Sequence, residues 1–401
     1  MESPLQTGAL SPERAAALLD RSEEKIEHLY LHLPFCERIC PYCDYSAVAG
    51  AGTDIGVFLD MLKKEAELHE KAGILPHMIL DGGTLLLGGG TPSWFEPRIL
   101  TYLLSWLGSL TGGRWAEATL EMNPEHADME RLEALRSGGI SRLSLGVQSL
   151  NPAVLERLGR IHSPMTAREA AGAARQCGFD VSMDIIFAVP GQDQQGWQND
   201  VREIVGLAPD HISIYELTYE PGTPFASWKG SGRLAALDED WQAEAYSWAA
   251  EYLESEGYRR YEVSNFARSG KASLHNQACR DGSSYLGLGP SANSLLGTIR
   301  TANIFNYRDW AAVLMNESRI PWESSEELDD RAIARERVLL GLQTAGGLNL
   351  ETLPSQYREE VSERASEIVR EGFGQWNDEN TLVLSNRGIL VADMLAVRLS
   401  P

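Results

Sequence analysis

Apolar residues recur along the first half of the chain in short runs that alternate with stretches of helical periodicity. In residues 28–33, Leu29, Leu31 and Leu33 alternate with polar or aromatic residues, a pattern typical of a β-strand. Further strands are predicted at residues 84–87, 118–122, 142–147, 181–189 and 211–217. Helices are predicted near residues 53–71, 98–107 and 129–137, in two pieces within 151–177, and in a segment that ends near 206.

Six strands alternating with helices at this spacing indicate parallel βαβ units, arranged either as a barrel or as an open doubly wound sheet. The residues in or near the C-terminal part of each strand help to decide between the two. They are Cys36, Gly89, Glu121, Gln148, Asp184 and Tyr215. In a barrel these strand ends converge on one mouth, whereas in an open sheet they spread along a line. The predicted fold is therefore a partial, TIM-like (β/α)6 barrel of the α/β class.

Beyond residue 220 the pattern changes, and the chain is predicted to leave the barrel. A long amphipathic helix is expected over 238–256, a strand over 261–266 and a glycine-rich turn region over 285–290. Nearer the C-terminus the pattern predicts helices at 330–342, 354–371 and 388–395, with a short strand pair around 382–384. We therefore expect a mobile N-terminal segment (1–24), a barrel core (25–225), a barrel extension (226–320) and a C-terminal helical or winged domain (321–401).

The composition narrows the class of protein. The chain has 35 basic and 57 acidic side chains in 401 residues, which gives a formal net charge of −22. Such a charge repels a phosphate backbone, so nucleic acid is not an expected partner. No apolar run approaches the roughly 20 residues that span a bilayer, and the start of the chain lacks the apolar stretch of a signal peptide. We therefore expect a cytoplasmic protein without a transmembrane segment.

Three of the five cysteines fall in one short segment. Cys36, Cys40 and Cys43 form a C-x3-C-x2-C motif, whereas Cys177 and Cys279 are isolated. An odd number of cysteines in a chain of this length argues against a disulfide framework. The clustered three suit a soft metal centre instead.

Two metal centres fit the motif, and a group of inert thiols is the third alternative. Zinc needs four ligands, and His32, four residues before Cys36, could be the fourth. Its place on a strand, between two leucines, weakens that alternative. An iron–sulfur centre takes thiolates, and three cysteines leave one iron of a 4Fe–4S cluster without a protein ligand. We favour the 4Fe–4S cluster.

Several phrases around and beyond this motif carry a family resemblance. The motif resembles the radical S-adenosylmethionine (SAM) signature, and Gly89-Gly90-Thr91-Pro92 resembles the second, SAM-binding motif of that superfamily. Over residues 28–400 the chain resembles the HemN/HemW group. The phrases that carry this likeness are, in order, YLHLPFCERICPYCDY, LLGGGTPS, SLGVQSLN, LGRIH, YELTYEPGT, YEVSNFA and YLGLGP. The resemblance implies a radical SAM barrel in which SAM chelates the open iron of a 4Fe–4S cluster.

The resemblance also implies a set of SAM-binding residues at matching positions of this chain. They are Tyr30, Gly89, Gly90, Thr91, Glu121, Gln148, Arg160 and Asp184. Glycines lack a Cβ atom, so backbone carbonyls of the second motif can approach the SAM ammonium closely. The two carboxylates can accept from ribose hydroxyls or from the ammonium, and the arginine can pair with the SAM carboxylate. No catalytic residue is assigned.

One position distinguishes the two branches of the group. In the coproporphyrinogen III oxidases of this group the motif is CxxxCxxCxC, with a fourth cysteine two residues after the third. In this chain Tyr45 occupies the position of that fourth cysteine. The oxidases also have a longer N-terminal extension. The resemblance therefore implies the HemW branch, whose members are thought to bind haem and deliver it to acceptor proteins. An oxidase that acts on a porphyrinogen in tetrapyrrole biosynthesis is the alternative, and whether the chain is an enzyme stays open.

The haem-binding motif of that branch, HNxxYW, is only partly kept. His275 and Asn276 are present, but Cys279-Arg280 stands in place of the Tyr-Trp pair. Cys279 could be a thiolate ligand of haem beside His275, since both ligand types occur. Alternatively the site handles another substrate, and His275 is a hydrogen-bonded structural residue. The implied partners are haem or a porphyrin, a haem-acceptor protein, and reduced flavodoxin or ferredoxin as electron donor.

Overall fold

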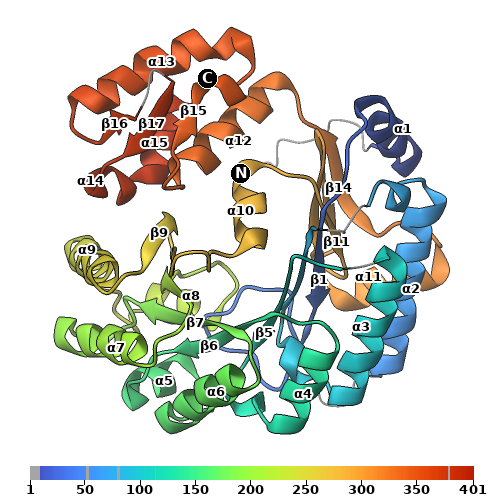
Figure 1. Cartoon of the computed structure of the whole chain (residues 1–401), viewed down its shortest axis with the longest axis horizontal. Helices are drawn as coiled ribbons and strands as arrows, with labels where there is room; N and C mark the ends of the chain where they lie inside the picture. The colour runs from blue at the N-terminus through green and yellow to red at the C-terminus, as the bar shows by residue number, and fades with distance from the viewer. Residues whose placement is uncertain (1–9, 51–53, 79–81, 113, 378–379) are drawn as a thin grey trace.

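The computed structural model describes residues 10–50, 54–78, 82–112, 114–377 and 380–401. Within these residues the centre is a twelve-stranded sheet in the order β14-β13-β12-β11-β1-β4-β5-β6-β7-β8-β10-β9. Six consecutive strands of that order run parallel and curve into part of a barrel (Figure 1). They are β1 (His28–Leu33), β4 (Thr84–Gly89), β5 (Glu117–Met122), β6 (Arg142–Gln148), β7 (Asp180–Phe187) and β8 (His211–Glu216). The predicted partial (β/α)6 barrel is confirmed.

Helices follow these strands and form an arc around the outside of the parallel sheet (Figure 1). They are α2 (Ile55–Lys71), α3 (Pro97–Thr111), α4 (Met129–Ser137), α5 (Pro152–Leu158), α6 (Pro164–Gln176) and α7 (Gln194–Gly206). Most begin at a side chain that accepts a backbone N–H of the first turn, such as Asp54, Asp128 and Ser163. None of the described helices is both long enough and apolar enough to cross a bilayer.

The sheet continues beyond the barrel strands on both sides. Beside β1, the strand β11 (Tyr285–Leu288) runs parallel, and β12 (Asn293–Leu296), β13 (Ile299–Asn303) and β14 (Trp322–Glu327) follow antiparallel. Beside β8, β10 (Asn265–Ala267) and β9 (Arg259–Glu262) follow antiparallel. The sequence predicts one strand and a turn where the structure has the pair β9–β10 and the strand β11. At Gly287 a Cβ would lie 2.2 Å from the Asn293 carbonyl oxygen, so the glycine permits close strand packing there and does not make a turn.

The remaining segments of the first 320 residues add short elements around the barrel. They are β2 (Phe35–Cys36) and β3 (Val48–Ala49), which pair in parallel, and the helices α8 (Pro224–Gly230), α9 (Glu239–Ser255), α10 (Leu274–Asp281) and α11 (Tyr307–Asn316). Single 3₁₀ turns lie at Leu75–His77, Pro92–Trp94 and Pro124–His126. Strand β2 matters most for the site, because the cysteine motif begins in it.

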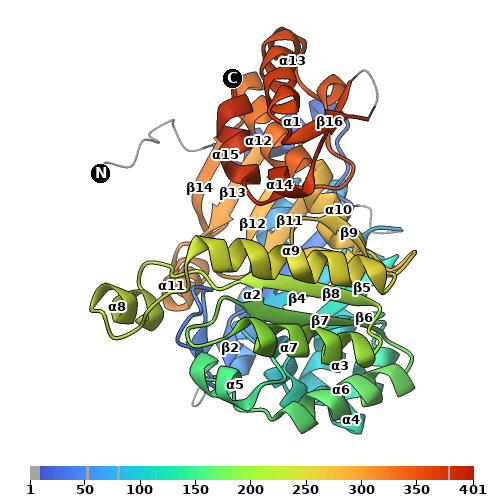
Figure 2. The ribbon, with the colours of Figure 1, turned by 90° about the vertical axis from the view of Figure 1, so that its left-hand side faces the viewer.

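The C-terminal residues form a helical unit with a small antiparallel sheet, at the opposite end of the molecule from α4 and α6 (Figure 2). Its elements are α12 (Asp330–Leu342), β15 (Leu348–Asn349), a 3₁₀ turn (Leu350–Thr352), α13 (Ser355–Arg370), β16 (Gly374–Trp376), β17 (Thr381–Leu384), α14 (Asn386–Ile389) and α15 (Ala392–Leu399). The helix predicted over 388–395 is divided, because Val391 leaves the helical conformation, with a φ of −128° and a ψ of 26°.

The N-terminal segment, predicted to be mobile up to residue 24, contains a helix. This helix, α1 (Pro12–Ser22), is capped by Ser11 and buries Leu19. The Ser325 hydroxyl of β14 donates to the Leu10 carbonyl oxygen at 3.0 Å. Residues 10–22 therefore pack against the edge of the sheet, and residues 1–9 lie outside the described part of the chain.

Candidate cofactor site at the mouth of the barrel

A cavity of about 400 Å³ opens at the C-terminal ends of the barrel strands. All six residues that the sequence places near the strand ends line it, namely Cys36, Gly89, Glu121, Gln148, Asp184 and Tyr215. Parallel strands of a barrel bring their carboxyl ends to one face, which is why residues so far apart in the sequence meet there. The cysteine loop after β2 forms a further wall of the cavity.

The three clustered cysteines lie around this cavity with free thiols. Burial raises the pKa of the Cys36 thiol, although a hydrogen bond from Thr91 acts in the opposite direction. Burial also raises the pKa of the Cys43 thiol, to about 11. Such thiols stay protonated at neutral pH unless a metal binds them as thiolates. The donor set is that of a soft metal centre.

His32 is not available as the fourth ligand of a zinc ion. Its Nε2 lies 2.9 Å from the Ser46 carbonyl oxygen and its Nδ1 lies 2.9 Å from the Tyr30 hydroxyl. A carbonyl only accepts, so Nε2 carries the proton and Nδ1 accepts from Tyr30. With both ring nitrogens engaged, His32 does not complete a four-ligand zinc site, whereas a 4Fe–4S cluster can be held by the three thiolates, each on a different iron.

The glycine-rich segment at the end of β4 packs tightly against the end of β1 and the residue that follows it. Gly89 has a φ of 107°, which L side chains rarely adopt, and a Cβ there would lie 2.7 Å from the His32 ring. A Cβ on Gly90 would lie 2.7 Å from the Pro34 backbone. Both positions therefore require glycine, and both residues line the cavity without a side chain.

Buried acceptors face the cavity with unused hydrogen-bonding capacity. Within the described residues, Gln148 Oε1 and Asp184 Oδ1 are buried without a partner, while the other Asp184 oxygen accepts from Ser144 at 2.8 Å. Burial and the charge of Asp184 raise the pKa of Glu121 to about 7, partly offset by the Gly89 N–H. Burial also raises the pKa of Asp184. Gln148 further has a φ of 65°, a strained backbone of the kind found at binding sites. Such buried acceptors could bind the O–H or N–H donors of a ligand or of water.

Arg160 reaches the cavity from the loop after α5. Its Nη2 donates to Asn123 Oδ1 at 2.7 Å and to the Gly146 carbonyl oxygen at 2.9 Å, and its Nη1 donates to the Cys40 sulfur at 3.7 Å. Asn123 is not among the site residues predicted from the sequence. Its place directly after β5, followed by proline, is the signal that could have found it.

Seven of the eight residues predicted to contact SAM line the cavity, and one does not. Those that line the cavity are Gly89, Gly90, Thr91, Glu121, Gln148, Arg160 and Asp184. Tyr30 is not among the lining residues, and its hydroxyl donates to His32, behind the glycine-rich segment.

The predicted haem residues lie at the opposite end of the barrel. His275 Nδ1 is 2.8 Å from the hydroxyl of Thr84, the first residue of β4, and only 4% of His275 is exposed. Burial lowers the pKa of His275 to about 4 and raises that of the Cys279 thiol to about 11. The structure therefore does not bring His275 or Cys279 to the cysteine cluster. It favours the alternative that His275 is a hydrogen-bonded structural residue.

A buried ion pair fixes α10 across the N-terminal ends of the barrel strands. Arg142 Nε donates to Glu117 Oε2 at 2.9 Å, and only 4% and 6% of the two side chains are exposed. The second Glu117 oxygen accepts from the Ser273 hydroxyl at 3.0 Å and from the His275 N–H at 3.3 Å. Arg142 also donates to the Lys271 carbonyl oxygen at 3.0 Å. These contacts hold residues 271–281 as a plug in the barrel floor.

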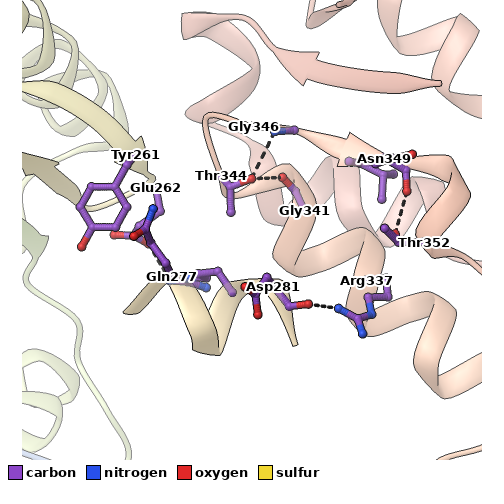
Figure 3. A pocket seen from close by; sticks show the side chains of 13 residues that line it. Tyr261, Glu262, Gln277, Asp281, Arg337, Gly341, Thr344, Gly346, Asn349 and Thr352 are labelled. Atoms are coloured by element: carbon purple, nitrogen blue, oxygen red, sulfur yellow. Dashed lines mark hydrogen bonds and ion pairs between the residues drawn. The ribbon is translucent and has the colours of Figure 1, made fainter. Parts of the chain in front are cut away.

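A second cavity, of about 330 Å³, lies between α10 and the C-terminal unit (Figure 3). Arg280, at the position of the tryptophan of HNxxYW, lines it and pairs with buried Glu262 at 2.8 Å. Neither His275 nor Cys279 is among its lining residues. The walls that the structure describes therefore offer no histidine or cysteine ligand for a haem iron.

Comparisons with known proteins give the family. The sequence of residues 30–204 matches the family model described as "Radical SAM superfamily". "Heme chaperone HemW" of Mycobacterium tuberculosis (strain ATCC 25618 / H37Rv) is 35% identical over 369 residues, which cover 91% of this chain and 92% of the relative. "Heme chaperone HemW" of Bacillus subtilis (strain 168) is 28% identical over 371 residues, which cover 91% of this chain and 96% of the relative.

The fold agrees with a solved structure. Coproporphyrinogen III oxidase (HemN) from Escherichia coli superposes with a TM-score of 0.83 over 99% of this chain and 96% of that chain, at 20% identity. At this identity the likeness shows the fold alone. The barrel and the family match together define a radical SAM protein, a class that implies a 4Fe–4S cluster and SAM. Within that class, the chain belongs to the HemW family.

Proposed function

We propose that Cys36, Cys40 and Cys43 hold a 4Fe–4S cluster and that the cavity beside them binds SAM. Three features support this assignment: free thiols in a soft donor set, unpaired buried acceptors, and glycines where a Cβ would collide. The residues proposed to bind SAM are Gly89, Gly90, Thr91, Glu121, Gln148, Arg160 and Asp184, and Tyr30 is proposed to support them without contacting SAM. When bound, the two groups supply one-electron chemistry at the SAM sulfonium.

The chain's own residues would bind and orient SAM in this arrangement. The unpaired oxygens of Gln148 and Asp184 accept from its hydroxyl or ammonium donors. Arg160 lines the same cavity, where its guanidinium charge would attract the SAM carboxylate. Tyr30, through His32, supports the glycine-rich segment from behind.

We further propose that the protein is a haem chaperone, which binds haem as cargo and passes it to an acceptor protein. The observation that carries this proposal is the likeness to the HemW relatives, which spans 91% of the chain. Tyr45, at the position of the oxidases' fourth cysteine, supports the same branch. We also propose that the protein is cytoplasmic and that reduced flavodoxin or ferredoxin donates electrons to its cluster. The proposed domain boundaries lie after residues 24, 225 and 320.

Haem transfer tests this function directly. Haem is titrated anaerobically into the reconstituted protein, and the complex is then mixed with apomyoglobin as a general acceptor while the Soret band is followed. We expect saturable uptake and then movement of haem to apomyoglobin. Failure to bind haem, together with 5′-deoxyadenosine formation that depends on added coproporphyrinogen, would contradict the proposal and favour the oxidase.

We expect His275→Ala to take up haem with the affinity of the wild type, because His275 is buried and bonded to Thr84. Cys279→Ala should likewise keep its haem affinity, since Cys279 is not among the residues that line the cavity beside α10. The same titration measures both variants, with thermal unfolding as the control for folding. A large loss of affinity in a variant that unfolds normally would restore that residue as a haem ligand.

SAM affinity should fall as the pH falls through 7. The pKa of Glu121 is raised to about 7 by burial, so the carboxylate is ionised above this pH and protonated below it. If only the ionised form accepts from SAM, the apparent Kd is about tenfold higher at pH 6 than at pH 8. Equilibrium dialysis with reconstituted protein measures this, and Glu121→Gln should remove the pH dependence. An equal pH dependence in Glu121→Gln would exclude Glu121 as its source.

A further inference from the structure

Two sulfurs of the cysteine motif receive a hydrogen bond from a neighbouring side chain. Thr91 Oγ1 donates to the Cys36 sulfur at 3.3 Å, and Arg160 Nη1 donates to the Cys40 sulfur at 3.7 Å. The family resemblance assigns both of these side chains to SAM. Their contacts with sulfur belong to the cysteine loop itself and need no bound ligand.

Both side-chain donors are held in place by other contacts. The Thr91 backbone N–H donates to the Phe35 carbonyl oxygen at 2.8 Å, and only 7% of Thr91 is exposed. Arg160 uses Nη2 for Asn123 and Gly146, which leaves Nη1 directed at Cys40. The donors are therefore set by the fold before any cofactor binds.

The hydrogen bonds from Thr91 and Arg160 should affect how easily a cluster at this site is reduced. The cavity wall carries the carboxyl groups of Glu121 and Asp184, and burial raises the pKa of both. One-electron reduction of a cluster at this site adds one negative charge and breaks no bond. Hydrogen bonds to the cysteine sulfurs stabilise that added charge and so raise the reduction potential. Arg160 contributes a full positive charge as well.

We propose that Thr91 and Arg160 are positioning residues that set the reduction potential of the cluster through Cys36 and Cys40, in addition to any contact with SAM. This inference rests on the cluster assignment made above. It goes beyond that assignment because it predicts an effect of both residues when SAM is absent.

Midpoint potentials, measured by anaerobic redox titration without SAM, test the inference. Thr91→Val removes the hydroxyl and keeps the side-chain shape, whereas Thr91→Ser keeps the hydroxyl. We expect Thr91→Val and Arg160→Gln to have more negative potentials than the wild type, and Thr91→Ser to stay close to it. Arg157→Gln is the matched control, because it removes a nearby exposed arginine on α5 that contacts no cysteine sulfur in the described structure.

The possible results separate this inference from the cluster assignment. A wild-type protein without iron and sulfide would overturn the assignment itself. A wild-type cluster whose potential is unchanged in Thr91→Val and in Arg160→Gln would overturn only the inference. So would a shift in Arg157→Gln as large as that in Arg160→Gln, because the effect would then come from net charge. If Arg160→Gln fails to assemble a cluster, the comparison of Thr91→Val with Thr91→Ser decides.

Discussion

Replacing any one of Cys36, Cys40 or Cys43 by alanine should remove nearly all of the iron and sulfide that the wild type takes up on anaerobic reconstitution. Three thiolates are the proposed protein ligands of the cluster, and a site with two has neither the charge nor the geometry to hold it. Iron and sulfide analysis, together with the visible charge-transfer absorbance, measures the loss. SAM binding should fall with it, because the open iron would be part of the proposed SAM site.

Cys177, which belongs neither to the motif nor to α10, provides the matched control. Cys177 is half-buried at the end of α6, away from the cavity, and Cys177→Ala should keep the iron and sulfide content of the wild type. Thermal unfolding of the apoproteins checks that the motif variants fold. Full iron content in a motif variant, or an equal loss in Cys177→Ala, would contradict the assignment.

Replacing Arg142 by methionine should lower the free energy of unfolding by about 3–5 kcal/mol, because it leaves the Glu117 carboxylate buried without its charged partner. Glu117 also accepts from Ser273 and from the backbone of His275, so the plug of residues 271–281 should loosen at the same time. Urea unfolding followed by circular dichroism measures the free energy. Hydrogen exchange of α10 measures the loosening.

An exposed ion pair on the outside of the barrel is the control for this prediction. Arg168 pairs with Glu203 between α6 and α7, and 37% and 50% of the two side chains are exposed. Arg168→Met should change the free energy of unfolding by less than about 1 kcal/mol, because exposed pairs are screened by solvent. Equal effects of Arg142→Met and Arg168→Met would show that burial of the Glu117 pair is not what stabilises the floor.

The sequence predicts best those elements whose caps and apolar period agree. The helices α4 and α12 have the predicted bounds, and each begins at an aspartate, Asp128 and Asp329, whose side chain accepts a first-turn N–H. Strands β13 and β14 are missed because their sequences, IRTAN and WESSEE, do not alternate between apolar and polar residues. Their position follows from pairing in the sheet, which a local pattern does not contain.

The candidate site likewise has a part that the sequence predicts and a part that it does not. The strand-end residues from Cys36 to Tyr215 are predictable, because parallel strands of a barrel bring these ends together. The hydrogen bonds of Arg160 to Asn123 and to Cys40 are not, because they join loops after three different strands. Nor does the sequence reveal that α10 closes the floor and not the mouth. That placement depends on the tertiary contact between His275 and Thr84.

Mössbauer spectroscopy of the reconstituted cluster, with and without SAM, tests the central claim most directly. If the three cysteines leave one iron open, one of the four irons should change its isomer shift when SAM binds, and the other three should keep theirs. Four irons that are insensitive to SAM would show that SAM does not bind an open iron of the cluster, and would contradict this account of the site.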